Sequence, residues 1–313
     1  MEPWWQKNKL SALESWWQKN NLMKYKKYLF LMIAFLGVTF FVKAQKQKLD
    51  SLSLDSLKDY EIRLSGLCYS MVRDFDEEAR ITSGKNFIRQ MGRALKVSNS
   101  YYYPFDSLKN VMILHAPDDL FRIITWNVAT NDEKFRYFGV IQMNPEKLVK
   151  LNKKEVLFEN IYPLIDRSDS IDNFLFKQLP PNFWFGATYY KMVKTTFNKA
   201  DYYTLLGWDG AGAETNRKVV DVIRFQKGQP VFGAPIFDLK RKATYSRLVY
   251  EFNNQATMTL RYDEKRKYLI YENIVPDKPE NAGFFQYYYP DGSFDYLIWK
   301  NGVWEKQVGF LEN

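Results

Sequence analysis

The sequence predicts an α+β protein in which a helical segment precedes a mainly antiparallel β meander. Between residues 51 and 95, apolar residues recur at steps of three and four, which is typical of amphipathic helices. Beyond residue 110, short runs rich in Val, Ile, Tyr and Phe are separated by turn residues. Asp-Gly and Asn-Gly pairs lie between some of these runs, which favours hairpins and therefore antiparallel pairing.

Two helices are expected at the start of this region. The first carries an apolar stripe made of Leu57, Leu64, Leu67, Met71, Val72 and Phe75. The second is predicted to begin at an N-cap, Ser83, and to share one face among Phe87, Ile88, Met91 and Leu95. Cys68 is the single cysteine, so no internal disulfide forms, and we expect it to be a small buried residue of the first helix.

The strands follow in chain order. We expect them at residues 111–115, 121–128, 135–143, 188–197, 202–208, 218–225, 231–233, 247–252, 257–262, 268–274, 285–289, 294–299 and 303–306. Residues 145–183 are less regular, and Pro145 is placed to open a short helix. Turns are predicted at Asp291–Gly292 and Asn301–Gly302. The meander is compatible with a barrel, a sandwich or an open sheet, with a small propeller-like arrangement as the alternative.

A secretory signal peptide is predicted at residues 23–44. Three lysines follow Met23, residues 28–42 are uncharged and apolar, and the segment ends in a cleavage pattern between Ala44 and Gln45. The apolar run is shorter than the roughly 20 residues of a membrane span, which favours cleavage over an uncleaved anchor. We therefore expect a periplasmic or secreted protein, with no membrane attachment after cleavage.

Residues 1–22 contain a short duplication, because the pentapeptide WWQKN occurs twice. We interpret this segment as a dispensable leader or a mis-assigned start, and whether translation begins at Met1 or Met23 stays open. The expected organisation is then a leader at 1–22, the signal peptide at 23–44, a helical segment at 45–100 and a β-rich domain at 101–313.

The charge of the expected mature chain is close to balanced. Without residues 1–44, the 45 Lys and Arg fall to 38 and the 36 Asp and Glu to 34, so a net charge of +9 becomes +4. Both signs are interspersed, which argues against a nucleic-acid-binding surface. One His and one Cys are too few for a His/Cys zinc site, and no phosphate-binding loop is present. We expect neither a metal nor a cofactor.

The residue types point to binding more than to catalysis. A Ser-His-Asp arrangement would depend on the single histidine, His115, at the end of a short strand. Aromatic rings near strand ends and loops are candidates for stacking on a glycan or a surface protein, together with one loop acid. These candidates are Trp126, Trp184, Trp208, Asp209 and Trp299. We expect a non-catalytic binding or structural protein, with a carboxylate-dependent glycan hydrolase as the alternative. The acids considered for that chemistry are Asp118, Asp119, Asp209, Asp291 and Asp295.

Five phrases occurring in order carry a resemblance to known sequences. They are FRIITW at 121–126, WFGATYY at 184–190, YYTLLGWDG at 202–210, FGAPIF at 232–237 and YPDGSFD at 289–295. Over roughly residues 85–306 the chain resembles a group of uncharacterised exported proteins of Bacteroidetes-type bacteria. The resemblance implies an extracytoplasmic setting in a Gram-negative bacterium, and it brings no activity, ligand or site residue.

Overall fold

The computed structural model describes residues 49–131, 134–152 and 157–310. The expected leader and signal peptide, with Ala44 and Gln45, lie outside the described residues. Residues 53–310 belong to one compact unit in which helices and sheets share contacts. Among the residues described, no helix combines the length and apolarity needed to cross a bilayer.

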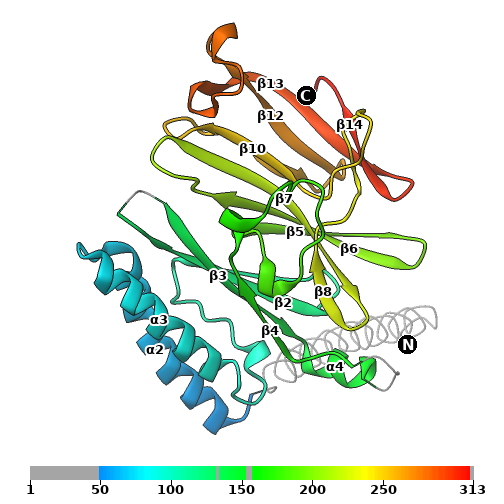
Figure 1. The fold of residues 1–313 in the computed structure, drawn as a ribbon. Coiled ribbons are helices and arrows are strands. Elements are labelled where there is room, and N and C mark those ends of the chain that lie inside the picture. Colours follow the sequence, from blue (N-terminus) through cyan, green and yellow to red (C-terminus); the bar gives the residue numbers. More distant parts are fainter. Residues whose placement is uncertain (1–48, 132–133, 153–156, 311–313) are drawn as a thin grey trace, which may run out of the picture. The chain divides into compact units, whose positions relative to one another are not determined.

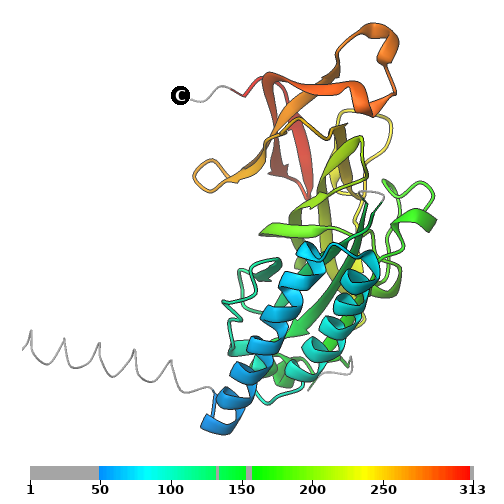
Figure 2. The same cartoon turned by 90° about the vertical axis from the view of Figure 1, so that its left-hand side faces the viewer.

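Two long helices open this unit, α2 (Ser51–Arg73) and α3 (Glu77–Ala94). They lie beside the first sheet (Figures 1 and 2), where Phe87 of α3 packs on Trp126 of β2. Cys68 is buried on the inner face of α2 as expected, and burial raises the pKa of its thiol to about 12. The prediction for the start of α3 was wrong. The helix begins six residues before Ser83, because Asp76 accepts hydrogen bonds from the amides of Glu78 and Ala79 as the N-cap.

The first sheet is a four-stranded antiparallel meander in the order β1-β2-β3-β4. Its strands are β1 (Val111–His115), β2 (Phe121–Ala129), β3 (Phe135–Met143) and β4 (Ile161–Ile165). The short helix α4 (Pro145–Leu151) lies between β3 and β4, with Pro145 at its first turn as predicted and Asn144 as its N-cap.

The second sheet is antiparallel, in the order β10-β7-β6-β5, and β8 pairs with β7 next to β10. Its strands are β5 (Thr188–Phe197), β6 (Ala200–Asp209), β7 (Thr215–Gln226), β8 (Gln229–Phe232) and β10 (Leu248–Asn253). Successive residues Leu205 and Leu206 belong to different core clusters, as do Val219 and Val220. Because side chains alternate along a strand, both faces of this sheet are buried, against the first sheet and the third sheet respectively.

The third sheet has the order β11-β12-β13-β14-β9, with a parallel pairing between β14 and β9. Its strands are β9 (Phe237–Asp238), β11 (Leu260–Asp263), β12 (Tyr268–Pro276), β13 (Tyr288–Lys300) and β14 (Val303–Gln307). The fold class is confirmed: three open, mainly antiparallel sheets follow the helices, and they are not closed into a barrel.

The predicted turn at Asp291–Gly292 was wrong, because β13 runs through it. Glu272 pairs with Phe294 and Ile274 with Pro290, so three residues of β13 face one residue of β12. This bulge uses the same turn chemistry, since Ser293 donates from its amide to the Asp291 carboxylate at 2.8 Å. The Asn301–Gly302 turn is confirmed, with positive φ at both residues.

Candidate functional site

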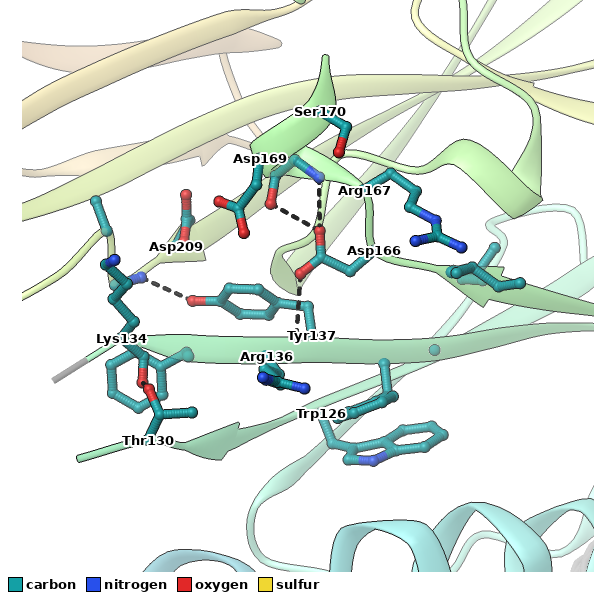
Figure 3. A pocket seen from close by; sticks show the side chains of 18 of the residues that line it. Trp126, Thr130, Lys134, Arg136, Tyr137, Asp166, Arg167, Asp169, Ser170 and Asp209 are labelled. Atoms are coloured by element: carbon teal, nitrogen blue, oxygen red, sulfur yellow. Dashed lines mark hydrogen bonds between the residues drawn. The ribbon is translucent and has the colours of Figure 1, made fainter. Parts of the chain in front are cut away.

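A cavity of about 840 Å³ lies along the edge of β3 that β4 leaves uncovered. The last pair between these strands joins Phe138 to Ile165, so β3 continues beyond β4 through Phe135, Arg136 and Tyr137. Side chains from β3, from the loop after β4 and from the end of β6 surround this hollow (Figure 3). The cavity is therefore lined by residues of the first and the second sheet, which are far apart in the sequence.

Asp209, the last residue of β6, is the buried acid of this cavity. Burial raises the pKa of its carboxyl group to about 6, while the positive charge of Arg217 and the interaction with Tyr137 act in the opposite direction. Arg217 contacts the carboxylate from β7 at 3.3 Å. A carboxyl group with a pKa near 6 is partly protonated at neutral pH, so Asp209 can both donate and accept hydrogen bonds in the cavity.

Tyr137 positions the chain that follows Asp209. Its hydroxyl oxygen accepts a hydrogen bond from the Gly210 amide at 2.7 Å, and burial raises the pKa of the phenol far above its usual range. Gly210 has no room for a side chain, because an added Cβ would lie 2.5 Å from the ring of Phe135. The turn after β6 is thus held against β3 by one hydrogen bond and one close approach.

Asp166 fastens the loop after β4 to its surroundings. Its carboxylate accepts hydrogen bonds from the amides of Tyr137 at 3.2 Å, Ser168 at 3.0 Å and Gly186 at 3.3 Å, and from the Ser168 hydroxyl at 2.7 Å. Three of these donors reach Oδ1 and one reaches Oδ2, and every one of them belongs to a neighbouring segment of the chain. Asp166 is therefore a positioning residue in this structure.

The accessible part of the cavity wall carries both signs of charge. Lys134, Arg136 and Arg167 are exposed cations, and Asp169 is an exposed acid of the same loop as Asp166. Counting every charged lining residue, four cations (Lys134, Arg136, Arg167, Arg217) face four acids (Glu77, Asp166, Asp169, Asp209). This balance selects against a ligand with a strong net charge of either sign.

The structure brings two of the five predicted binding residues to the cavity, Trp126 and Asp209. Trp126 is only 3% exposed and packs between Phe87 and Phe138, and its indole N–H has no hydrogen-bond partner among the described residues. Figure 3 shows it on the opposite side of β3 from Tyr137 and Asp209. A buried donor without a partner is unusual, but this one is enclosed by aromatic rings on the far side of β3 from Asp209.

The other three tryptophans serve packing. Trp184 is fully buried, and its indole N–H donates to the Tyr189 hydroxyl at 3.0 Å. Trp208 is half-buried beside the ring of Phe135, next to the cavity. Trp299 packs on Tyr202 and Trp304 in the core between the second and third sheets.

The other acids considered from the sequence are occupied elsewhere. Asp118 binds Lys194 and the Tyr203 hydroxyl, Asp119 accepts from Tyr101 and Asn144, Asp291 shapes the β13 bulge, and Asp295 pairs with Lys306. His115 lies at the end of β1, where its ring nitrogen contacts the Tyr101 hydroxyl at 3.3 Å. None of these groups lines the cavity.

Sequence reasoning did not single out Tyr137, Asp166 or Arg136. The one local signal was the polar run Asp166–Ser170 after an apolar strand, which indicates a turn and does not indicate a site.

Within the described part of the chain, no cluster of three or more His, Cys, Asp or Glu side chains is arranged to hold a metal ion. No family model and no curated protein matches this chain.

Proposed function

We propose that the protein is an extracytoplasmic binding protein that holds a hydroxyl-rich ligand, a glycan, in the cavity beside β3. The balanced charges of the wall support an uncharged polar ligand over a polyanion or a polycation. Carboxylate and guanidinium groups suit hydroxyl groups, which donate and accept hydrogen bonds, and the rings of Phe135 and Phe138 offer apolar surface beside them.

The observation that carries the proposal is Asp209. A buried carboxyl group whose pKa is raised to about 6, at the wall of a cavity of about 840 Å³, is typical of a functional site. The fold holds it there although burial disfavours its charged form. The extracytoplasmic localisation in this proposal rests on the sequence alone, that is, on the signal peptide expected at 23–44 and on the resemblance to exported Bacteroidetes-type proteins.

Titration of the full chain with an immobilised glycan array, followed by calorimetry with the strongest hit, tests the proposal. We expect saturable binding that Asp209→Asn and Arg136→Ala each weaken about tenfold, which corresponds to one lost hydrogen bond to a charged group. Asp59→Asn, an exposed acid on α2, is the matched control and leaves binding unchanged. Absence of binding to every glycan, or equal binding by Asp209→Asn, would overturn the proposal.

A second candidate function is hydrolysis of the bound glycan, and the raised pKa of Asp209 specifically favours it. A general acid needs a carboxyl group that is still protonated near neutral pH, and glycoside hydrolysis pairs it with a second carboxylate. Asp169 is the exposed acid of the same cavity, and Figure 3 shows its side chain on the side of the cavity where Asp209 lies. Release of reducing ends by the wild type would establish it if Asp209→Asn and Asp169→Asn lose this release even at glycan concentrations that saturate their weakened binding. Binding without turnover would leave the protein a binding module.

A further inference from the structure

A second hollow of about 530 Å³ adjoins the cavity. Both are lined by Lys134 and Ala211, so they meet at the start of β3 and the loop after β6. The second hollow continues along the β6–β7 loop to Glu251 of β10 and to residues 283–286, which lead into β13. Each hollow alone falls in the range of roughly 300–1,000 Å³ that suits one small ligand, and the two together exceed it.

Two exposed aromatic rings stand at the far end of the second hollow. Phe284 is 57% exposed and Phe285 is 42% exposed, which is unusual for adjacent large apolar side chains. The backbone around them is nevertheless fixed. Asn253 of β10 donates to the Gln286 carbonyl at 2.6 Å, and the Gly283 amide donates to the Tyr288 hydroxyl at 3.0 Å. The rings are thus presented on a rigid support, as a stacking platform requires.

Arg217 connects the acids of the two hollows. Its guanidinium group contacts Asp209 at 3.3 Å and donates from Nε to Glu251 at 2.8 Å. Glu251 also accepts from the Thr215 hydroxyl at 2.7 Å, so its carboxylate is oriented at the wall of the second hollow. Arg217 therefore links an acid at the wall of the first hollow to an acid at the wall of the second.

We propose that the second hollow is a further subsite for the same ligand, and that the protein takes an oligosaccharide chain whose outer units stack on Phe284 and Phe285. This inference rests on the proposed function, because it extends the glycan bound beside Asp209. A chain of linked polar rings matches two adjoining hollows of which the second ends in aromatic faces, since sugar rings present C–H groups to aromatic side chains and hydroxyl groups to carboxylates.

A size ladder of the strongest array hit, from the monosaccharide to the hexasaccharide, tests the inference by calorimetry on the full chain. We expect affinity to rise with length until the second hollow is filled. The double variant Phe284→Ala/Phe285→Ala should bind the long members about tenfold more weakly and the short members unchanged. Phe75→Ala, which removes a fully exposed ring at the α2–α3 junction, is the control and should match the wild type.

The outcomes separate the two proposals. Asp209→Asn should weaken binding at every length, because every member of the ladder occupies the first cavity. If affinity does not change with length and the double phenylalanine variant binds like the wild type, the subsite is overturned, while the proposal for the first cavity stands. Absence of binding at every length overturns both. A third outcome would also overturn the subsite. If the wild type sediments with anionic phospholipid vesicles and the double variant does not, while the double variant keeps the wild-type dependence of affinity on glycan length, the two rings bind a lipid surface.

Discussion

Arg122 and Arg247 are both fully buried, but within the described part of the chain only Arg247 has a carboxylate among its hydrogen-bond partners. Arg247 makes two contacts with the Asp221 carboxylate, at 3.0 and 3.1 Å, and donates to the Phe174 carbonyl at 2.6 Å. Arg122 donates to the carbonyls of Tyr103 and Ser100 and to the Gln142 amide oxygen, at 2.7–2.9 Å. The described residues give Arg122 no carboxylate hydrogen-bond partner, and burial lowers its pKa to about 10.

The comparison shows that neutral acceptors can hold a buried guanidinium group. Arg122 lies over the rings of Tyr101 and Phe105, at 5.6 and 5.5 Å from their centroids, so the aromatic faces supply part of the missing negative charge. Both arginines perform the same structural task, since each ties an irregular segment to a strand. Their difference lies in what happens when a partner is removed.

The largest effect is expected for Asp221→Asn. This change leaves the charge of Arg247 buried without a counter-charge and also removes an acceptor of the Tyr189 hydroxyl, so it should lower the free energy of unfolding by about 3–5 kcal/mol. Urea denaturation followed by tryptophan fluorescence measures it. The double variant Asp221→Leu/Arg247→Met should recover most of the loss, and a double variant as unstable as the single one would contradict this interpretation.

A smaller loss is expected for Arg122→Met. The cation disappears with its desolvation cost, but three buried acceptors lose their donors, so the free energy of unfolding should fall by about 2–3 kcal/mol. The same urea titration applies. If Arg122→Met loses more free energy of unfolding than Asp221→Asn does, the neutral acceptors of Arg122 contribute more to stability than the carboxylate partner of Arg247. That result would contradict the order expected here.

Asp209→Asn should raise stability above pH 6. The pKa of Asp209 is raised from 3.8 to about 6 in the folded chain, so the folded state binds the proton more tightly than the unfolded state does. The wild type then loses stability as pH rises from about 4 to above 6, by about 1–3 kcal/mol, and the variant lacks this slope. Thermal unfolding of both proteins at pH 4 and pH 8 measures the difference, and parallel profiles would refute it. Unlike Asp221, this acid shares its arginine with Glu251.

The smallest change is expected for Thr195→Val. The Thr195 hydroxyl oxygen is buried without a hydrogen-bond partner in the described structure. It therefore differs from the two arginines, whose buried polar groups all have partners of some kind, charged or neutral. Removing it should stabilise the chain by up to about 1 kcal/mol. A measurable loss of stability in urea would show that the hydroxyl is satisfied in solution.

Local patterns predicted most of the fold. Asn301–Gly302 needs only its two residues to turn the chain, and the strands beside it alternate regularly. The strand expected at 285–289 was wrong at its start, because residues 285–287 form a 3-10 helix and β13 begins at Tyr288. Two other errors arose where one local signal serves two geometries. Asp291–Gly292 builds a bulge instead of a hairpin because β12 remains paired on both sides of it. Ser83 has the chemistry of an N-cap but lies inside a helix that Asp76 has already started.

The candidate site was only partly predictable for a different reason. Asp209 stands out in the sequence because it follows a strong strand within a Gly-rich loop. Its relation to Tyr137 and Asp166 depends on how the second sheet packs on the first, and no periodicity in the sequence encodes that distance. Arg136 gave no signal at all, since an exposed arginine in a strand is ordinary until the neighbouring strand ends beside it.

The contact between Asp166 and the Tyr137 amide also bears on self-association. Where β4 stops, β3 would present backbone donors to any extended chain in its neighbourhood, and such edges recruit strands from other copies. The carboxylate of Asp166 takes up the outward amide of Tyr137, and Pro163 lies in the adjoining edge strand β4. The same side chain that shapes the cavity therefore also satisfies one backbone donor at the open edge of the first sheet, which leaves one donor fewer for a strand of another copy to pair with.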